Sequence, residues 1–294
     1  MSKPLYHVDG ELVAADEATV SVEDRGFLYG DAAFETMRAY GGEVFEWTAH
    51  MDRLAETCEI LGLDHGLSRS DLETRVDETL TANDYSEAYV RLSITRGVQP
   101  GKLTPDEAVD PTVVVIVKPL PSGGHEGTPV WDGPATLQTA KTKRVPEASI
   151  PTRAKTHNYL NGILARLELR VTDADEAMMV DHAGHVTEGA TSNLFFVQEN
   201  ALRTPTLEGP ILPGITRRIV LQLAAEEGIP IKEGQYTPDE VRQADEVFLT
   251  NSTWELRPVE VVDGITIGEP GEPGPVTTLL SRLFESHVEA RHYE

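Results

Sequence analysis

The stretch Arg153-Ala-Lys155-Thr-His-Asn158-Tyr159-Leu-Asn161-Gly-Ile-Leu-Ala places a lysine directly ahead of an amphipathic helix. The apolar residues that define this helix recur at three- and four-residue spacing: Leu160, Ile163, Leu164, Leu167 and Val171. Because Pro151 biases the residue before it toward extended geometry, we expect Lys155 to lie where a strand gives way to the helix. A lysine that is partly desolvated there loses its proton more readily and attacks carbonyl groups. The alternative is an ordinary surface lysine.

The charge balance is strongly acidic, with 49 Asp and Glu against 25 Lys and Arg and a formal net charge of −24. The carboxylates are scattered, a pattern typical of salt-adapted (halophilic) proteins, in which salt screens the self-repulsion. This charge argues against nucleic acid or an anionic membrane as a partner. The one cysteine, Cys58, excludes an intramolecular disulfide. Without an apolar signal segment or a run of roughly 18 apolar residues, the sequence predicts a cytoplasmic protein.

Periodicity and turn residues predict an α/β (α+β) chain with two domains. A linker rich in Pro and Gly, residues 119–129, separates a small α/β domain, residues 1–118, from a larger domain, residues 130–294. In the first domain we expect hairpins that turn at Asp9-Gly10 and Gly41-Gly42, helices over 47–61 and 71–80 (capped by Ser70), and strands over 87–95 and 112–118, the last buried on both faces. In the second we expect strands over 135–141, 176–180, 186–188, 194–197, 246–250 and 259–262, and helices over 215–227 and 276–289. The strands from 176 to 197 are expected to form a meander.

A carboxylate and several anion-binding groups follow the lysine along the chain. Glu188 ends a strand ahead of a small-residue turn, so its carboxylate has a fixed place from which it can keep a pyridine nitrogen protonated. Pro213-Gly214-Ile215-Thr216 begins a helix whose free amides and hydroxyl suit a phosphate. Ser252-Thr253 offers further donors, and Arg53 offers a cation. Each has an ordinary alternative, namely a solvated turn residue, a helix cap or a surface charge, but together with Lys155 they predict a site for pyridoxal phosphate.

Six motifs in one order resemble the class IV aminotransferases, the fold-type IV pyridoxal phosphate enzymes. The motifs are Asp24-Arg-Gly-Phe-Leu-Tyr-Gly-Asp31, His50-x-x-Arg53-Leu, Lys155 with Asn158, Glu188-Gly-x-x-Ser-Asn-Leu-Phe195, Leu212-Pro-Gly-Ile-Thr-Arg217, and Thr250-Asn-Ser252 before Arg257-Pro-Val259. The resemblance implies a small N-terminal α/β domain and a larger C-terminal domain with a barrel-like β core flanked by helices. It also implies pyridoxal 5′-phosphate as cofactor, no metal, and transfer of an amino group from an amino acid to a 2-oxo acid by a ping-pong Schiff-base mechanism.

The resemblance also implies a role for individual residues. Lys155 is the catalytic residue, which forms the Schiff base with the cofactor and moves the substrate proton, and Glu188 pairs with the pyridine nitrogen. The implied cofactor-binding residues are Arg53, Lys155, Tyr159, Glu188, Ser192, Asn193, Gly214, Ile215, Thr216, Ser252 and Thr253. The implied substrate-binding residues are Tyr29, Thr36, Tyr89, Arg91, Arg96 and Lys102.

The motifs point to different members of the family. Tyr89-Val-Arg91 is similar to the Tyr-x-Arg of branched-chain transaminases, in which the arginine helps to bind the substrate carboxylate. In contrast, Lys155-x-x-Asn158 has the spacing of D-amino-acid transaminases and aminodeoxychorismate lyases, and Thr36 stands where the lyases carry threonine. The Arg and His with which D-amino-acid enzymes grip a carboxylate are replaced by Gly101 and Leu103.

We therefore expect a transaminase for hydrophobic or branched-chain amino acids. The alternative within the family is 4-amino-4-deoxychorismate lyase, which releases 4-aminobenzoate and pyruvate. A remoter alternative is a non-catalytic binding module, against which the presence of Lys155, Glu188 and Arg53 argues. The resemblance further implies a homodimer with active sites at the interface, and residues 97–104 are our candidate for the loop that reaches the neighbouring subunit. The physiological donor, the preference for L- or D-amino acids, and oligomers beyond the dimer stay open.

Overall fold

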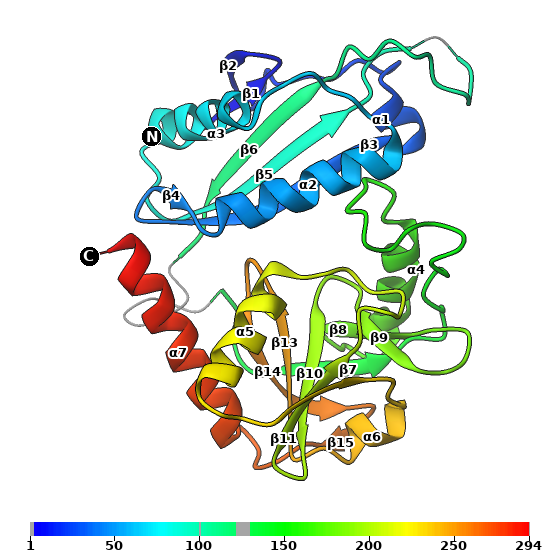
Figure 1. Cartoon of the computed structure of the whole chain (residues 1–294), viewed down its shortest axis with the longest axis vertical. Coiled ribbons are helices and arrows are strands. Elements are labelled where there is room, and N and C mark those ends of the chain that lie inside the picture. The colour runs from blue at the N-terminus through cyan, green and yellow to red at the C-terminus, as the bar shows by residue number, and fades with distance from the viewer. Residues whose placement is uncertain (1–2, 100, 122–129, 294) are drawn as a thin grey trace. The chain divides into compact units, whose positions relative to one another are not determined.

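The computed structural model describes residues 3–99, 101–121 and 130–293, which belong to two compact units (Figure 1). Unit 1 comprises Met1–Pro121, Ala154–Asn158 and His292–Glu294, and unit 2 comprises Ser122–Arg153 and Tyr159–Arg291. The break after Pro121 falls inside the linker predicted over 119–129, of which residues 122–129 lie outside the described part of the chain. A single cut there does not separate the units, because the segment around Lys155 pairs with a strand of unit 1.

Within the described residues, unit 1 is built on a six-stranded antiparallel sheet in the order β2-β1-β6-β5-β3-β4. Its elements in chain order are β1 (Leu5–Val8), β2 (Glu11–Ala14), α1 (Arg25–Tyr29), β3 (Ala32–Tyr40), β4 (Glu43–Val44), α2 (Trp47–Leu61), α3 (Arg69–Asn83), β5 (Ala88–Thr95) and β6 (Val113–Pro119). Both predicted hairpins are confirmed, and the positive φ angles of Asp9 (49°) and Gly10 (101°) fit a two-residue turn. Helix α2 has the predicted bounds.

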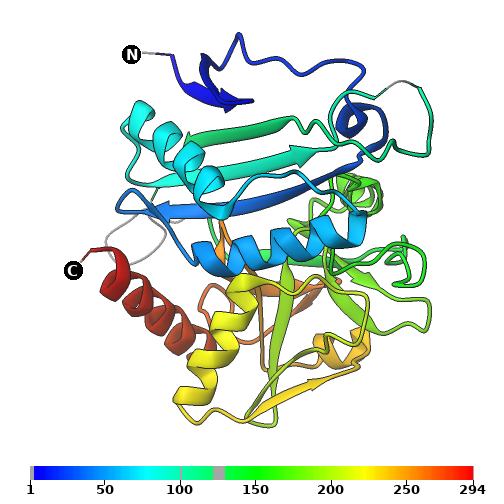
Figure 2. The ribbon, with the colours of Figure 1, turned by 45° about the horizontal axis from the view of Figure 1, so that its top comes forward.

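Helices α2 and α3 pack against one face of this sheet (Figures 1 and 2). Met51 from α2 and Val76 from α3 are buried in one apolar cluster with Met37, Val90 and Val115 from three neighbouring strands. Because successive side chains of a strand point to opposite faces, the residues between these positions lie on the other face of the sheet. That second face carries several of the predicted site residues.

Two predictions for unit 1 are wrong in detail. Strand β6 is buried at alternate residues rather than on both faces, because it pairs antiparallel with β1 and β5 and the helices described for unit 1 pack against one of its faces. Helix α3 begins at Arg69, earlier than predicted, because its cap is Ser68 and not Ser70. Ser68 Oγ accepts the Asp71 amide at 3.1 Å, and the Asp71 carboxylate accepts the Ser68 amide at 2.9 Å, which forms a capping box.

In the described part of unit 2, nine strands form one mixed sheet in the order β12-β11-β10-β13-β14-β7-β8-β9, with β15 paired to β14. The strands are β7 (Ala135–Thr139), β8 (Glu176–Val180), β9 (Val186–Gly189), β10 (Asn193–Gln198), β11 (Ala201–Pro205), β12 (Ile231–Gly234), β13 (Glu246–Asn251), β14 (Glu255–Val262) and β15 (Ile265–Thr266). The helices are α4 (Leu160–Glu168), the 3₁₀ helix η1 (Leu169–Val171), α5 (Ile215–Glu226), α6 (Pro238–Arg242) and α7 (Pro275–His292). The sheet curls into a half-barrel flanked by helices, so the predicted α/β fold with a barrel-like core is confirmed (Figure 1).

The predicted meander is only half right. Strands β8 and β9 form an antiparallel hairpin, but β10 pairs with β11 and β13 instead of β9. The turn over residues 189–192 redirects the chain between β9 and β10, and its backbone is bonded to both sides. The Gly189 amide donates to Ser192 O at 2.7 Å, and the Ala190 amide donates to Ala177 O on β8 at 3.0 Å.

Helix α4 is confirmed, but its apolar stripe does not form the core contact. The buried residues of α4 are Gly162 and Ala165, which pack beside Ala190 and the β8 strand. A side chain at position 162 would approach Ala190 O to 3.3 Å, so only a small face fits there. The large apolar residues face outward with high exposure: Leu160 59%, Ile163 53%, Leu164 46%, Leu167 42% and Val171 89%. The strand expected before Lys155 is also absent from the described chain, since β7 ends at Thr139 and 140–159 is irregular.

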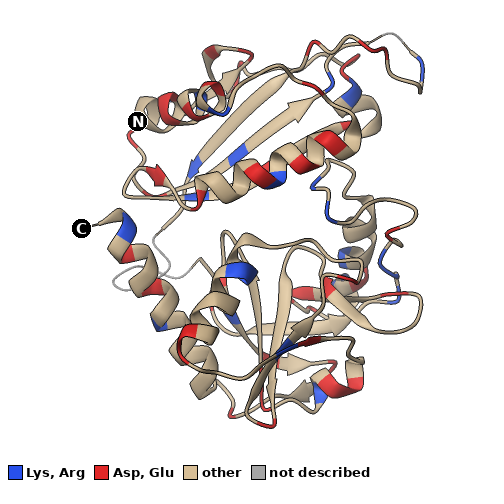
Figure 3. Ribbon diagram, in the orientation of Figure 1, with Lys and Arg blue, Asp and Glu red and all other residues tan. Residues whose placement is uncertain are grey.

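Charged residues are spread over the elements of both units, as the sequence predicts (Figure 3). Acidic residues occur on the helices of each unit as well as in the connecting loops. Among the residues that the structure describes, no helix combines the length and apolar character needed to cross a membrane.

Candidate active site

The backbone of Lys155 is held from two sides within unit 1. On one side, Lys155 O accepts the Phe34 amide at 3.0 Å, and the His157 amide donates to Ala32 O at 3.0 Å, which fixes the segment along β3. On the other side, Thr57 Oγ1 of α2 accepts the Lys155 amide at 3.0 Å. The amine Nζ lies 4.4 Å from the centre of the Phe34 ring. The predicted nucleophile is therefore positioned by backbone pairing although it lies outside any regular strand.

The sheet face opposite α2 and α3 carries Phe34 together with two predicted substrate-binding residues. Across β3 and β5, Phe34 pairs with Ser93 and Thr36 pairs with Arg91, so these four side chains share one face. The guanidinium of Arg91 lies over the Phe34 ring, with Cζ 3.8 Å from the ring centre. Because the amine of Lys155 lies 4.4 Å from the same ring centre, one aromatic side chain contacts both cations.

A second contact fixes the direction of Arg91. Its Nε donates to Ser93 Oγ at 3.1 Å, and Ser93 Oγ also exchanges a hydrogen bond with His157 Nε2 at 3.1 Å. Burial, and then the charge of Arg91, lower the pKa of His157 to about 4. The ring is therefore neutral at pH 7 and adds no charge beside the guanidinium. Tyr89, two residues before Arg91 on β5, is half-buried on the same sheet face.

Arg53 belongs to a buried ionic cluster between α2 and β3. Its Nε and Nη2 donate to Oε1 and Oε2 of Glu35 at 2.8 and 2.6 Å, and His50 Nδ1 contacts Oε2 at 2.8 Å. The three residues are 7%, 0% and 2% exposed in the order Arg53, Glu35, His50. Burial, the largest single effect, raises the pKa of Glu35, but the charge of Arg53 and the hydrogen bonds from Arg53 and His50 together outweigh it and hold the pKa at about 2. Burial lowers the pKa of His50, so Glu35 is the charged partner that orients the guanidinium.

The remaining predicted residues of unit 1 have other contacts. Arg96 donates to both oxygens of Asp31, at 2.8 and 3.1 Å, and to the carbonyls of Leu61 and Gly62. Its guanidinium is thus engaged in the structure of the unit, and its role with substrate stays a prediction. Lys102 is exposed, and its carbonyl accepts Arg25 Nη1 at 2.6 Å. Tyr29 ends α1 and is 40% exposed.

In unit 2, Glu188 lies at the centre of a polar cluster with Arg144, Asn193 and the Leu212 amide. Its Oε1 pairs with Nη2 of Arg144 at 2.8 Å, and its Oε2 accepts the Leu212 amide at 2.9 Å and Asn193 Nδ2 at 3.4 Å. Arg144 is itself fixed, because its Nε donates to Pro210 O at 3.2 Å. These three groups hold a carboxylate that is only 6% exposed. A charge that is buried in this way is stable because it is paired and hydrogen-bonded.

Asn193 joins this carboxylate to the start of α5. Besides Glu188 it contacts Leu212 O, to which Nδ2 donates at 3.0 Å. A side chain at Gly214 would lie 1.9 Å from Asn193 Oδ1, so any larger residue at the cap of α5 would displace the Asn193 side chain. Gly214 caps the helix without a side-chain bond, and the first intrahelical bond runs from Arg218 N to Gly214 O. The amides of residues 215–217 therefore precede the bonded part of the helix, which is the arrangement that binds anions.

Four further predicted cofactor residues, Ser192, Ser252, Thr253 and Tyr159, lie in unit 2. Ser192 is buried, and its hydroxyl donates to Glu176 Oε2 at 3.3 Å. Thr253 lies in the turn between β13 and β14, where its amide and hydroxyl both donate to Asn251 Oδ1 at 3.0 Å, and Ser252 precedes it in the same turn. Tyr159 is the residue that precedes α4.

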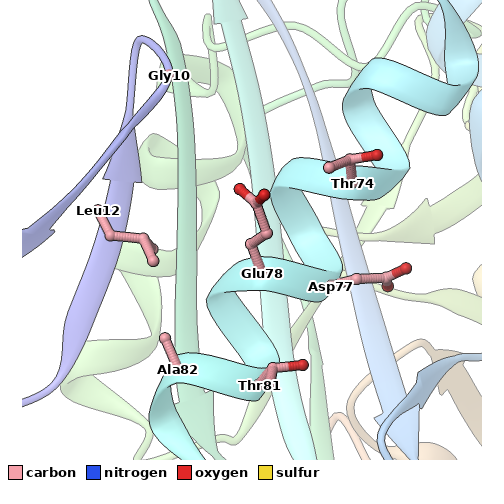
Figure 4. A pocket seen from close by; sticks show the side chains of 7 residues that line it. All are labelled: Gly10, Leu12, Thr74, Asp77, Glu78, Thr81 and Ala82. Atoms are coloured by element: carbon pink, nitrogen blue, oxygen red, sulfur yellow. The ribbon is translucent and has the colours of Figure 1, made fainter.

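One surface hollow lies away from these residues. The hairpin β1–β2 and helix α3 border a space of about 630 Å³ that is lined by Gly10, Leu12, Thr74, Asp77, Glu78, Thr81 and Ala82 (Figure 4). Two carboxylates, Asp77 and Glu78, lie on its helix side. None of the predicted site residues lines it, so the hollow is not part of the candidate site.

Sequence reasoning missed several residues that contact the predicted ones. Glu35 directly precedes the predicted substrate residue Thr36, and a buried acid beside the His-x-x-Arg of α2 could have been inferred from the alternation of β3. Arg144, Glu176 and His157 gave no such signal. Arg144 precedes Glu188 by 44 residues and Glu176 precedes it by 12 residues. Only the fold brings Arg144 to Glu188 and Glu176 to Ser192.

Comparison with known proteins places the chain in a family. The model of the family described as amino-transferase class IV matches residues 32–262. A putative branched-chain-amino-acid aminotransferase of Methanocaldococcus jannaschii is 37% identical over 279 residues, which cover 95% of this chain and 94% of that protein. A D-alanine aminotransferase of Listeria monocytogenes is 32% identical and covers 96% of this chain and 95% of its own length.

The fold agrees with the sequence match. A crystal structure of the branched-chain aminotransferase from Thermoproteus uzoniensis with norvaline has a TM-score of 0.89 and 30% identity, and it covers 99% of this chain and 97% of its own. The family match spans the segments that carry Lys155, Arg53, Glu188 and the start of α5. The chain belongs to the class IV aminotransferases, which are pyridoxal phosphate enzymes.

Proposed function

We propose that this aminotransferase acts on hydrophobic, branched-chain L-amino acids and the matching 2-oxo acids. The observation that carries the proposal is the Phe34 ring, which contacts the amine of Lys155 at 4.4 Å and the guanidinium of Arg91 at 3.8 Å. An amino acid presents an amino group and a carboxylate on one carbon, so a reactive amine and a carboxylate-binding cation are needed close together. The 37% identity to a branched-chain enzyme supports the substrate class.

The residues of the chain fit the cofactor that the family uses. Pyridoxal phosphate, when bound, supplies an aldehyde that condenses with amines and a ring that accepts electrons from the substrate carbon. The glycine cap of α5 leaves the amides of Ile215 and Thr216 for a phosphate, and a side chain at Gly214 would collide with Asn193. Arg53, oriented by Glu35, is our proposed cation for the phosphate. Glu188 is our proposed partner for the protonated ring nitrogen.

Lys155 is the proposed base and acid of the reaction. Its amine would take the proton from the substrate Cα and give it to the carbon of the cofactor's aldehyde group, so the same group would act as base and then as acid. The three hydrogen bonds that hold the backbone of residues 155 and 157 would fix the direction from which Nζ acts. Arg91 holds the substrate carboxylate, with its plane set by Ser93, and Thr36 lies beside it across the strand pair.

A half-reaction tests the substrate. The holoenzyme is mixed with L-leucine or D-alanine without a 2-oxo acid, and the absorbance of the cofactor above about 400 nm is followed as the amino group is transferred. We expect L-leucine to remove this absorbance and D-alanine to leave it. Loss of the band with D-alanine alone would overturn the substrate proposal, and no response to either amino acid would overturn amino transfer itself. The transaminase names of the relatives do not favour the lyase alternative.

We also propose that the enzyme is a homodimer. Five large apolar residues on one side of α4 and η1 are 42–89% exposed, a stripe larger than isolated surface residues explain. A second copy of this chain is the occupant that we propose, because the stripe would then be buried in both subunits. Adaptation to high salt and a cytoplasmic location are supported by the net charge of −24 and by the composition, and they stay predictions.

A further inference from the structure

A buried carboxylate that the reaction does not use lies beneath the turn after Glu188. Glu176, the first residue of β8, is 0% exposed. A fully buried charge costs several kcal/mol unless it is paired and hydrogen-bonded, so its contacts carry information about why it is there.

In its hydrogen bonds with the other described residues, the Glu176 carboxylate is the acceptor. Its Oε1 accepts Arg166 Nη1 at 3.0 Å and its neighbour's amide, Ala177 N, at 2.9 Å. Its Oε2 accepts Thr191 Oγ1 at 2.5 Å, the Thr191 amide at 3.2 Å and Ser192 Oγ at 3.3 Å. One oxygen thus binds β8 and helix α4, and the other binds the turn. Because all the partners donate, the ionised carboxylate fits them and an amide in its place would not.

The turn is packed tightly on this carboxylate. A side chain at Gly189 would lie 2.2 Å from Ser192 Oγ and 3.1 Å from Glu176 Cγ, so the chain between Glu188 and Asn193 has little freedom. Glu188 and Asn193, on either side of the turn, are the residues that face each other at 3.4 Å and meet at the Leu212 segment. The direction of the Glu188 carboxylate therefore depends on the turn, and the turn depends on Glu176.

We infer that Glu176 is a positioning residue for Glu188: its ionised carboxylate fixes the 189–192 turn and aims Glu188 at the ring nitrogen of the cofactor. The inference rests on the proposed role of Glu188. Arg166 on α4 balances the charge of Glu176, and its side chain is 42% exposed. The same contact ties α4, which directly follows the Lys155 segment in the chain, to the turn that follows Glu188.

The test compares two ligands on the full chain stripped of cofactor. One ligand is pyridoxal phosphate, and the other is its carba analogue, in which CH replaces the ring nitrogen. The variants are Glu176→Gln, Glu188→Gln and, as a matched control, Glu199→Gln, whose side chain is 74% exposed. We expect Glu176→Gln and Glu188→Gln to lower the affinity for pyridoxal phosphate about tenfold, which is the effect of losing one hydrogen bond to a charged group. We expect the affinity for the analogue to change by less than about twofold, because no contact with a ring nitrogen is lost.

The outcomes separate this inference from the proposal beneath it. Suppose that Glu188→Gln lowers the affinity for pyridoxal phosphate alone, whereas Glu176→Gln lowers the affinity for both ligands or for neither. Glu176 then has only a structural role and the inference is wrong. If Glu188→Gln itself does not discriminate, the role proposed for Glu188 is overturned and the inference with it.

A second variant covers the case in which Glu176→Gln does not fold. Thr191 is exposed, and Thr191→Val removes the hydroxyl that donates to Glu176 Oε2 at 2.5 Å. We expect this variant to lower the affinity for pyridoxal phosphate but not for the analogue, by a smaller factor than Glu176→Gln. An equal effect of Thr191→Val on the two ligands would contradict the inference.

Discussion

The buried cluster of Glu35, His50 and Arg53 predicts a large and pH-dependent cost for Glu35→Gln. The pKa of Glu35 lies at about 2 in the folded protein, against 4.5 for a free glutamate. The difference of about 2.5 between these two pKa values corresponds to about 3 kcal/mol, at about 1.36 kcal/mol for each tenfold change in acidity. The folded pKa is depressed, so this stability is present above about pH 4.5 and is lost as the pH falls toward 2.

The expected result has two parts. At pH 7, Glu35→Gln destabilises unit 1 by about 3 kcal/mol, because Arg53 is left as a buried cation without its counter-charge. Between pH 4.5 and 2 the difference between the wild-type protein and the variant shrinks toward zero, because the wild-type carboxylate takes up a proton there.

Hydrogen exchange of the α2 amides measures this locally, because α2 carries His50 and Arg53 and belongs to unit 1. Glu59→Gln, an exposed substitution on the same helix, is the matched control and should change exchange little. An equal stability difference at pH 7 and pH 3 would refute the assignment of the charge to Glu35. Full protection of α2 in the variant at pH 7 would refute the importance of the cluster.

Three other predictions follow from contacts in unit 2. Gly214→Ala places Cβ 1.9 Å from Asn193 Oδ1 and should weaken cofactor affinity at least tenfold in a fluorescence titration, whereas Gly209→Ala, with a nearest contact of 3.4 Å, should not. Arg144→Met should cost about 2–4 kcal/mol in urea unfolding, because it leaves Glu188 buried without its cation, and Arg144→Lys should recover part of it. Leu164→Asp, at an exposed apolar position of α4, should convert the proposed dimer into a folded monomer in sedimentation experiments, and an unchanged dimer would contradict the proposed interface.

Apolar periodicity in the sequence predicted helices α2 and α4, but it predicted the buried face of α2 only. The bounds of α2 follow from a periodic apolar stripe that really faces the sheet, with Met51 and Leu54 buried. Helix α4 shows the limit of the same reasoning. Its stripe is as regular, yet the neighbouring turn at Ala190 admits only Gly162 and Ala165 on the inner side. Periodicity shows that a helix has an apolar face, but it does not show which surface that face meets.

The candidate site likewise contains residues that the sequence predicted and residues that it did not. Lys155, Arg53, Glu188 and Gly214 stand in motifs, because their chemistry needs a residue type at a fixed place in the chain. The residues that orient them, Glu35 behind Arg53 and Arg144 beside Glu188, act across strand pairs and loops. Their partners are set by the register of β3 against the helices and by the path of residues 140–159, neither of which sequence spacing specifies.

The division of the chain also limits how the protein can be dissected. Residues 154–158 complete unit 1 by pairing with β3, although more than 30 residues of unit 2 precede them after Pro121 and unit 2 resumes at Tyr159. An expression fragment that stops at Pro121 would lack both the reactive amine and the backbone partner of Phe34. During folding, this contact closes a loop of about 120 residues and should form late. The Lys155 segment thus joins a scaffold made much earlier on the ribosome, and split-protein or circular-permutation designs have to keep residues 154–158 attached to it.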